Sequence, residues 1–285
     1  MPELPEVETV RRGLEPALAR QRLSKVEIRR PDLRFAFPTN FVRRLTGFRV
    51  EAVRRRGKFL LAPLDSGETL IMHLGMSGRF AIGGSARCRD TGRSPPRADP
   101  KHTHVVFETE AGARVIFVDA RRFGFMELGE TASIDTHPRL AGLGPEPFDE
   151  RFAGAYLAAE FVNRRVGVKA LLMNQAVVAG LGNIYASEAL HRARIAPARP
   201  ANTIGREGLD QIPQAVRSVL KEAIASGGST LRDYAAADGS PGYFQHRFTV
   251  YGRGGQSCSS PGCGGTIRRS VQAGRATFHC PSCQK

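Results

Sequence analysis

The first ten residues, MPELPEVETV, place a proline directly behind the initiator methionine and surround it with acids. If Met1 is removed, Pro2 becomes a secondary amine at the chain terminus, and an unprotonated amine is a nucleophile that can form a covalent intermediate. A simpler interpretation is that Pro5 starts a helix and that the glutamates favour its positive end. The opening therefore predicts a helix start that also holds a candidate reagent.

The cysteines form a second group that could do chemistry. Four of the five lie in CSSPGC and CPSC near the end of the chain: Cys258, Cys263, Cys280 and Cys283. Two such pairs on two β-turns would present four thiolates to one tetrahedral Zn²⁺, and the wider spacing of the first pair stays within the usual range. Because this tail has little apolar surface, metal binding would supply folding free energy. Free buried cysteines are the alternative, but the segment offers few partners to bury them.

The charge balance points to a polyanionic partner, with 42 Lys and Arg against 27 Asp and Glu and a net charge of +15. Nucleic acid is the first candidate, because phosphates would neutralise the excess. A membrane surface is the rival, but the sequence has no basic amphipathic helix, and the uncharged stretch 170–187 contains Asn, Gln and Gly, which do not suit a helix that spans a membrane.

No signal peptide is visible, and an odd cysteine count then favours a metal site in a reducing cytoplasm over disulfides. Cys88 is left without a role.

These residues need elements to position them. Apolar residues at helical spacing predict a helix behind Pro5, which Pro16 should kink or end. Short alternating or β-branched runs then predict the strands of an antiparallel β-sandwich at residues 23–29, 47–53, 57–63, 68–75, 104–109 and 113–119. Helical patterns follow at residues 149–159, 168–173, 185–192 and 205–225. Loops are expected at 83–101 and 227–246, the second with helical potential near 230–236. RRSVQAGRATF, between the cysteine pairs, predicts a β-hairpin carrying Arg268, Arg269 and Arg275.

Several motifs together resemble one family nearly end to end. They are PELPEVETVRRGLEP, RRGKFL, HLGMSGRF, DARRFG, GLGNIYASEAL and GRATFHC with the cysteine tail. This pattern is similar to the formamidopyrimidine-DNA glycosylases. The resemblance implies a bifunctional base excision repair enzyme that removes oxidised purines from duplex DNA and then cuts the abasic strand. It also implies a monomer with one structural zinc, bound to DNA in the bacterial cytoplasm.

The implied fold class is α+β and multidomain, and composition alone gives the same order of β, α and metal modules. A β-sandwich with an N-terminal helix is expected in residues 1–134 and a linker in 135–148. A helix-two-turns-helix (H2TH) domain with a lesion-facing loop is expected in 149–246, and a zinc finger in 247–285.

The resemblance also assigns catalytic roles. Pro2 would attack the sugar C1′ and form an iminium ion, and Glu3 would donate or shuttle a proton at the ring oxygen. Lys58 would contact the base or a phosphate and assist as a general acid, while Arg275 would serve the final elimination and phosphate binding. Arginine is a poor proton donor, so the phosphate role is favoured. The alternatives are a helix-start acid for Glu3 and a solvated strand-end lysine for Lys58.

Further residues would reach the lesion. Met76, Arg121 and Phe123 match a set that fills the space left by a base rotated out of the helix, although Met and Phe more often belong to a core. His102 matches a contact to the DNA backbone, whereas His104 is expected to be structural.

Arg165, Lys169 and Asn183 match further backbone contacts, with Arg165 in a segment that differs in detail from the family. The loop 227–246 is expected to close over the displaced base. The extended loop 83–101 departs from the family pattern, and its arginines could add phosphate contacts or nothing.

Two other functions stay open. An endonuclease VIII-type glycosylase prefers oxidised pyrimidines, but the start PELPEVET favours the purine branch. A catalytically silent zinc-bearing DNA-binding protein is the second, and the joint presence of Pro2, Glu3 and Lys58 speaks against it.

Overall fold

The computed structural model describes residues 1–83, 100–230 and 241–285. The chain divides into two compact units. The first comprises Met1–Ala141 with Ser226–Tyr243, and the second Gly142–Ala225 with Phe244–Lys285. The predicted loop over 227–246 begins in the first unit, but residues 231–240 lie outside the described part of the chain, as do 84–99 with Cys88.

Helix α1 (Leu4–Leu18) opens the first unit and contributes to its core. Pro5 lies in the first turn, where a missing N–H costs nothing. Pro16 is inside the helix, which ends two residues later, close to the predicted break. One face of the helix is buried, through residues that include Leu4, Val7, Val10, Leu14 and Leu18.

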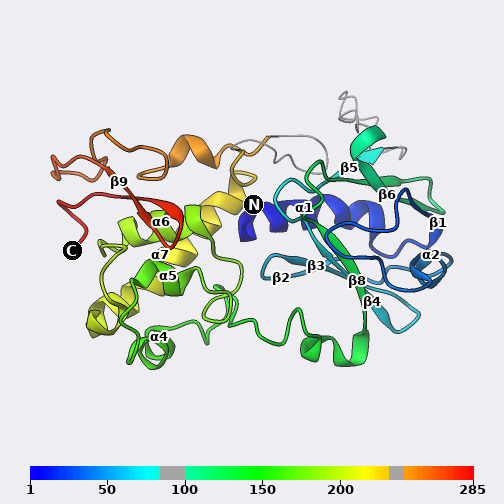
Figure 1. Cartoon of the computed structure of the whole chain (residues 1–285), viewed down its shortest axis with the longest axis horizontal. Coiled ribbons are helices and arrows are strands. Elements are labelled where there is room, and N and C mark those ends of the chain that lie inside the picture. Colours follow the sequence, from blue (N-terminus) through cyan, green and yellow to red (C-terminus); the bar gives the residue numbers. More distant parts are fainter. Residues whose placement is uncertain (84–99, 231–240) are drawn as a thin grey trace. The chain divides into compact units, whose positions relative to one another are not determined.

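The first unit also contains two antiparallel four-stranded sheets (Figure 1). One has the order β1 (Leu23–Ile28), β6 (Thr103–Thr109), β7 (Arg114–Val118) and β5 (Arg79–Gly83). The other has the order β2 (Arg54–Arg56), β3 (Phe59–Pro63), β4 (Glu68–His73) and β8 (Phe125–Glu130). A single apolar cluster joins both sheets to α1, through residues such as Val10, Leu60, Met72, Val105 and Phe117. The predicted β-sandwich is confirmed.

Some elements of this unit differ from the prediction. Residues 47–53 form no strand; Arg49 and Val50 make only isolated bridges, to Arg22 and Leu64. Gly47, at a φ of +86°, follows the short helix α2 (Phe41–Leu45), and the chain has to turn there. The sequence pattern does not predict strands β5 and β8, because both lie in glycine-containing segments whose alternation is interrupted. The described residues of this unit also form two 3-10 helices, η1 (Pro100–His102) and η2 (Thr131–Thr136).

The second unit is helical, as predicted. It contains α4 (Gly154–Phe161), α5 (Val168–Leu172), α6 (Asn183–Arg192) and α7 (Arg206–Ala225), with 3-10 turns at Ala201–Thr203 and Phe244–Arg247. Helix α4 starts later than expected, because the Asp149 side chain accepts the N–H of Arg151 at 2.9 Å and holds a turn there. In α7, buried residues recur at helical spacing: Leu209, Ile212, Val216, Val219, Leu220 and Ala223.

The predicted hairpin is present as β9 (Arg268–Gln272) and β10 (Arg275–His279). Ala273 and Gly274 form its two-residue turn, both with positive φ, which is the geometry that matches strand twist. A small core of Val250, Ile267 and Phe278 lies beside Cys280. Among the described residues, no helix combines the length and apolar content that crossing a bilayer requires.

Candidate functional site

The N-terminal turn holds the first two predicted catalytic residues. Pro2 and Glu3 are buried, whereas the side chain of Met1 is 50 % exposed. Glu3 is the N-cap of α1 and forms a capping box with Glu6, in which the Glu3 N–H donates to Glu6 Oε2 at 2.9 Å. Glu3 therefore does have the structural role of a helix cap, and the capping box holds the backbone of Glu3 in a fixed place.

Glu6 does more than the helix-start role expected from the sequence. Its Oε1 accepts the backbone N–H of Ser229 at 2.8 Å, while its Oε2 accepts the N–H of Glu3. A Cβ on Gly228, which has a φ of +80°, would lie 2.9 Å from Glu6 Oε1. The carboxylate thus ties the first turn of α1 to the start of the predicted lesion-facing loop. In the sequence, the three-residue spacing between Glu3 and Glu6, which is that of a capping box, is the signal that could have predicted this bonding role of Glu6.

Lys58 is buried at the turn between β2 and β3. Gly57, at a φ of +55°, allows that turn, and its carbonyl accepts from Arg55 Nη1 at 3.0 Å. Arg55 also bonds to Glu8 of α1 through Nε, at 3.3 Å. These bonds connect the turn that carries Lys58 to the helix that follows Glu3. Glu8 therefore has a specific structural role.

His73, which the sequence did not single out, lies at the end of β4. Its ring stacks on Phe125, with centroids 5.2 Å apart, and its Nδ1 accepts the N–H of Gly75 at 3.0 Å. Burial and then the charge of Lys58 lower the pKa of His73 to about 4, so the ring is neutral at pH 7. Histidine in a strand carries no sequence signal that separates this role from an ordinary core position.

Met76, Arg121 and Phe123 lie on two neighbouring loops. Met76 is 40 % and Phe123 41 % exposed, so neither belongs to the core. The Arg121 guanidinium lies 4.9 Å from the centre of the Phe123 ring. The loops touch through their backbones, because a Cβ on Gly75 would lie 2.2 Å from the carbonyl carbon of Phe123. The three predicted void-filling residues are thus presented together.

Asp119 organises the loop that carries Arg121 and Phe123. It is fully buried; its Oδ1 accepts from Ser77 Oγ at 2.6 Å, and its Oδ2 accepts the N–H of Gly124 at 2.7 Å. The Ser77 hydroxyl in turn accepts the N–H of Arg121 at 3.1 Å. One carboxylate therefore fixes both loops through buried hydrogen bonds.

The two histidines of KHTH differ in their surroundings. His104 is buried, with Nε2 2.8 Å from the carbonyl oxygen of Asp119, which agrees with the structural role predicted for it. His102 is half-buried at the end of η1, and its carbonyl accepts the N–H of Asp119.

Lys169 and Asn183 are joined in the second unit. Lys169 Nζ donates to Asn183 Oδ1 at 2.5 Å and to Thr277 Oγ1 at 2.7 Å, and Asn183 Nδ2 donates to the carbonyl of Ala276 at 2.9 Å. Lys169 and the exposed Arg275 also line one pocket of about 290 Å³, with Ala170, Met173, Asn174, Gln272 and Ala273. Helix α5 and the hairpin thus both line this pocket; Lys169 is only 2 % exposed and its ammonium bonds to Asn183 and Thr277, whereas Arg275 is exposed.

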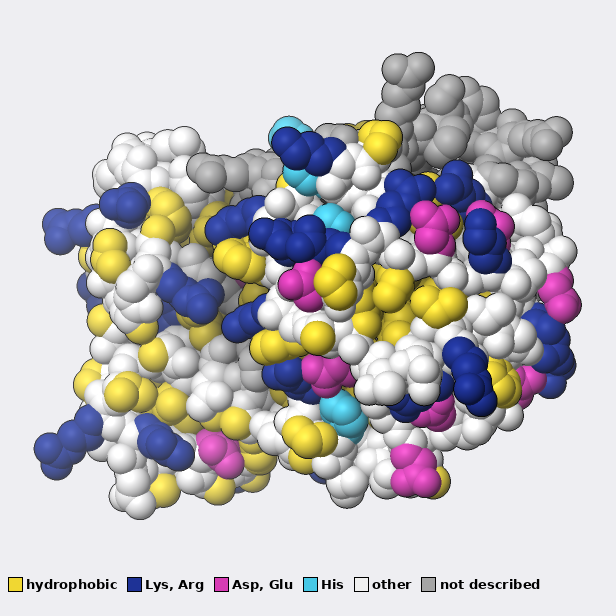
Figure 2. Space-filling view, turned by 45° about the vertical axis from the view of Figure 1, so that its right-hand side comes forward, with side chains coloured by type: hydrophobic (Ala, Val, Ile, Leu, Met, Phe, Trp, Pro, Cys, Tyr) yellow, Lys and Arg dark blue, Asp and Glu magenta, His cyan; other side chains and the backbone are white. Residues whose placement is uncertain are grey.

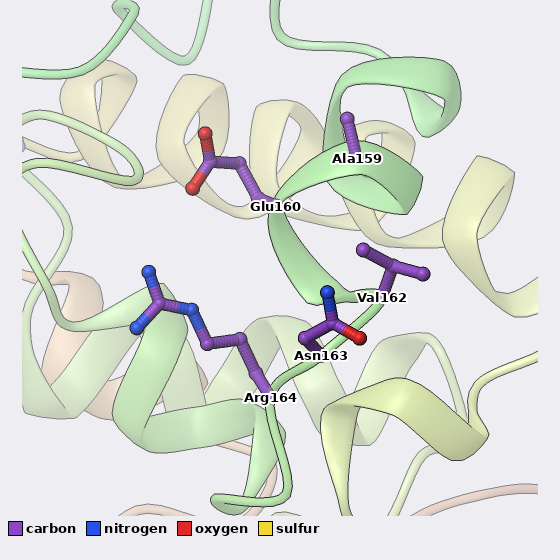
Figure 3. Close-up of a pocket in the computed structure, with 5 residues that line it drawn as sticks. All are labelled: Ala159, Glu160, Val162, Asn163 and Arg164. Carbon is purple, nitrogen blue, oxygen red and sulfur yellow. The ribbon is translucent and has the colours of Figure 1, made fainter.

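Arg165 is exposed in the turn after α4, and it does not line the pocket shared by Lys169 and Arg275. A separate open pocket lies beside it, formed by Ala159, Glu160, Val162, Asn163 and Arg164 (Figure 3). Its lining has one acid and one arginine, and none of the predicted site residues. This pocket is not part of the candidate site.

The four tail cysteines converge as predicted. Their Sγ atoms all lie within 4.8 Å of one another, with 3.5 Å between Cys263 and Cys280 and 3.8 Å between Cys258 and Cys283. Four sulfurs bound tetrahedrally at about 2.3 Å are about 3.8 Å apart, so the group fits a metal ion such as zinc. Burial acts to raise the pKa of Cys280, but the N–H groups of Cys283 and Ser282 together with the neighbouring thiols lower this pKa to about 7. That value favours the thiolate form that binds metal.

The charge excess is visible on the surface. Figure 2 shows Lys and Arg side chains spread over the face in view, with fewer Asp and Glu among them. Such a surface attracts a polyanion.

Comparisons with known proteins agree with this arrangement. The formamidopyrimidine-DNA glycosylase N-terminal domain matches residues 1–126, and the H2TH domain of the same family matches residues 143–235. Formamidopyrimidine-DNA glycosylases from Phenylobacterium zucineum (strain HLK1) and Caulobacter sp. (strain K31) are 58 % and 56 % identical over 287 residues, covering 100 % of each chain.

Solved structures match equally completely. The MutM (Fpg) protein of Thermus thermophilus is 41 % identical with a TM-score of 0.84, covering 99 % of this chain and 98 % of that one. The Lactococcus lactis Fpg in complex with DNA containing an abasic site is 33 % identical with a TM-score of 0.85, covering 99 % of both chains. The resemblance drawn from the sequence motifs is confirmed: the chain belongs to the formamidopyrimidine-DNA glycosylase family.

Proposed function

We infer that this protein is a DNA N-glycosylase of base excision repair that removes oxidised purines from duplex DNA and cleaves the resulting abasic strand. The observation that carries this inference is the full-length similarity to enzymes of that name, at 58 % identity. A neighbouring structure is a Lactococcus lactis Fpg variant in complex with DNA containing Fapy-dG. The same proposal includes a monomer that acts on DNA in the cytoplasm, at the nucleoid.

Pro2 is the nucleophile in this proposal. Once Met1 is removed, the proline nitrogen attacks C1′ of the damaged nucleoside, and the bond to the base breaks. Loss of the nitrogen's proton and cleavage of the C1′–O4′ bond of the sugar ring then give an iminium ion, which is positive without an added proton. It acidifies the C2′ hydrogen, and loss of that proton expels the 3′ phosphate and cleaves the strand by elimination. Glu3, held beside Pro2 by the capping box, donates or shuttles the proton at the sugar ring oxygen.

Lys58 serves the same reaction from the turn between β2 and β3. It bonds the damaged base or a phosphate and acts as a general acid during base loss. The charge of Lys58 reaches the His73 ring, which is neutral at pH 7 and so adds no positive charge of its own. Arg275 binds phosphate and assists the later elimination step.

The base leaves the helix stack before it reacts, at a cost of roughly a few kcal/mol. Met76 and Phe123 fill the vacated space as apolar wedges, and Arg121 donates to the orphaned base. Their shared exposure on two rigidly joined loops supports this assignment.

The phosphate backbone is held by His102, Arg165, Lys169, Asn183 and Arg275. The pocket shared by Lys169 and Arg275 supports two of these assignments, and the exposure of Arg165 is compatible with a third. The domain division at 1–134, 135–148, 149–246 and 247–285 is part of the same proposal.

Zinc is the metal proposed for the four cysteines. Cys258, Cys263, Cys280 and Cys283 would hold it, and when bound it supplies folding free energy to the tail and no reaction chemistry. The site would thereby fix the hairpin that carries Arg275.

Oxidised pyrimidines are a second candidate substrate, because the wild-type Lactococcus lactis Fpg has been solved with DNA containing an oxidised pyrimidine. Single-turnover base release from matched duplexes containing 8-oxoguanine or thymine glycol tests the choice. We expect faster release of 8-oxoguanine. Faster release of thymine glycol would overturn the purine assignment, and release of neither would favour a silent DNA-binding protein.

A further inference from the structure

A histidine lies against the cysteine cluster and belongs to none of the assignments above. His191, in the last turn of α6, is buried, and its Nε2 is 3.4 Å from Cys258 Sγ and 3.9 Å from Cys283 Sγ. It lies outside the group of four whose ligand atoms are mutually within 4.8 Å. The imidazole of His191 therefore lies beside the cluster of four sulfurs, on the side formed by Cys258 and Cys283.

A chain of hydrogen bonds sets the tautomer of this ring. The Glu188 carboxylate is buried and accepts four bonds, from the N–H groups of Thr249, Val250 and Tyr251 and from the Thr249 hydroxyl at 2.6 Å. Because the hydroxyl proton points to Glu188, Thr249 Oγ1 must accept from His191 Nδ1, 2.9 Å away.

The proton on Nδ1 leaves Nε2 with its lone pair, facing the sulfurs. Ser260 Oγ, 3.2 Å away, can donate to it. Neutral imidazole nitrogen is a standard zinc ligand, and a hydrogen bond from Nδ1–H to a fixed acceptor is the usual way that such a ligand is oriented.

We propose that His191 is a reserve ligand of the metal site, which takes the place of Cys258 when that thiolate is lost. Nitrogen and sulfur donors on one tetrahedral zinc are about 3.6 Å apart, given bonds of about 2.1 Å and 2.3 Å. His191 Nε2 lies 3.9 Å from Cys283 Sγ, close to this distance, and only 3.4 Å from Cys258 Sγ, so the ring is next to the position that the Cys258 sulfur would vacate. Without Cys258, the remaining three thiolates and this nitrogen make a Cys₃His set, which is an ordinary structural zinc site.

Zinc content of the full-length chain tests the proposal. We expect Cys258→Ser to retain about one zinc per chain and Cys258→Ser/His191→Phe to transfer zinc to a colorimetric chelator at least tenfold faster. Cobalt substituted into Cys258→Ser should show the ligand-field spectrum of three sulfurs and one nitrogen. Cys280→Ser is the matched control, since no described histidine bond reaches that sulfur, and it should lose zinc as readily as the double variant.

The single variant His191→Phe keeps all four cysteines and should hold zinc as the unchanged chain does. Equal release rates for Cys258→Ser and the double variant would overturn the proposal. So would loss of zinc from His191→Phe alone, which would give His191 a purely structural role.

Discussion

Glu3 combines a structural role, as the cap of α1, with its proposed role as a proton donor. It caps α1, and its backbone N–H is held by Glu6, so the carboxyl beside Pro2 is positioned by the helix start itself. A proton donor requires this fixed position, because proton transfer depends first on geometry. The capping role explains burial, and the proposed chemistry explains why an acid is needed.

Replacing Glu3 with Gln separates these roles. The amide oxygen still accepts in the cap but no longer shuttles a proton, so we expect base release to slow by about 10²–10⁴-fold while the melting temperature changes little. Single-turnover release and calorimetry measure both quantities. Glu15→Gln, at an exposed position of the same helix, is the control, and an active Glu3→Gln enzyme would leave Glu3 only its structural role.

His73 should make folding sensitive to acid. Its folded pKa of about 4 lies below the ordinary 6.5, so between these values the unfolded chain binds more protons, and stability is lost as the pH falls. From pH 7.5 to 5.0 this costs about 2 kcal/mol.

The variant His73→Phe keeps the ring stacking but removes the titration. It should be less stable than the unchanged protein at pH 7.5, because Gly75 loses its acceptor. The gap should narrow by about 2 kcal/mol at pH 5.0 in urea unfolding. A gap that stays constant with pH would contradict the assigned pKa.

Two loops act as one element at the proposed wedge. The loop of Met76 and the loop of Phe123 are joined by backbone contact at Gly75 and by the buried carboxylate of Asp119. A wedge that enters a base stack must resist bending, and this double attachment supplies the rigidity.

A pair of glycine variants tests this joint. Gly75→Ala places a Cβ 2.2 Å from the Phe123 backbone at a φ of +62°, whereas Gly67→Ala meets nothing within 4 Å at a φ of +85°. We expect Gly67→Ala to cost about 1 kcal/mol from backbone strain alone, and Gly75→Ala about 3 kcal/mol or more with impaired DNA binding. Chemical unfolding gives both values; equal costs would show that the loops are not joined as described.

Much of the fold is predictable at this scale, and the gaps have physical reasons. The hairpin and the cysteine cluster follow from local spacing, and the helices of the second unit from apolar periodicity. Strand β8 is not predictable in this way, since it lies in a glycine-containing segment whose alternation is interrupted, and residues 47–53 alternate like a strand yet find only isolated bridges. Likewise, the bond from Ser229 to Glu6 joins distant segments, which no local pattern reports.

The whole molecule is a polycation that has to find a lesion in a long polyanion. With a net charge of +15, attraction to phosphates supplies affinity without sequence preference. Specificity then depends on the displaced base and on the residues around Pro2. These two contributions should respond differently to salt.

Binding to duplex DNA should weaken steeply with salt, with a log–log slope of about −0.9 per neutralised phosphate. Arg275→Ala should reduce that slope by about one, since it removes one proposed phosphate contact. Arg206→Ala removes an arginine of α7 whose side chain is 97 % exposed and which has no proposed contact with DNA, so it should leave the slope unchanged. Fluorescence anisotropy titrations measure this, and a flat response in the unchanged protein would contradict the electrostatic account.

The most direct test of the central claim is to locate the covalent bond between protein and DNA. Borohydride reduction during reaction with an 8-oxoguanine duplex should trap an adduct, and peptide mass spectrometry should place the sugar on the nitrogen of Pro2 in a chain that lacks Met1. An adduct on Lys58 or another lysine, or full strand cleavage with no adduct, would contradict the assignment of Pro2 as the nucleophile.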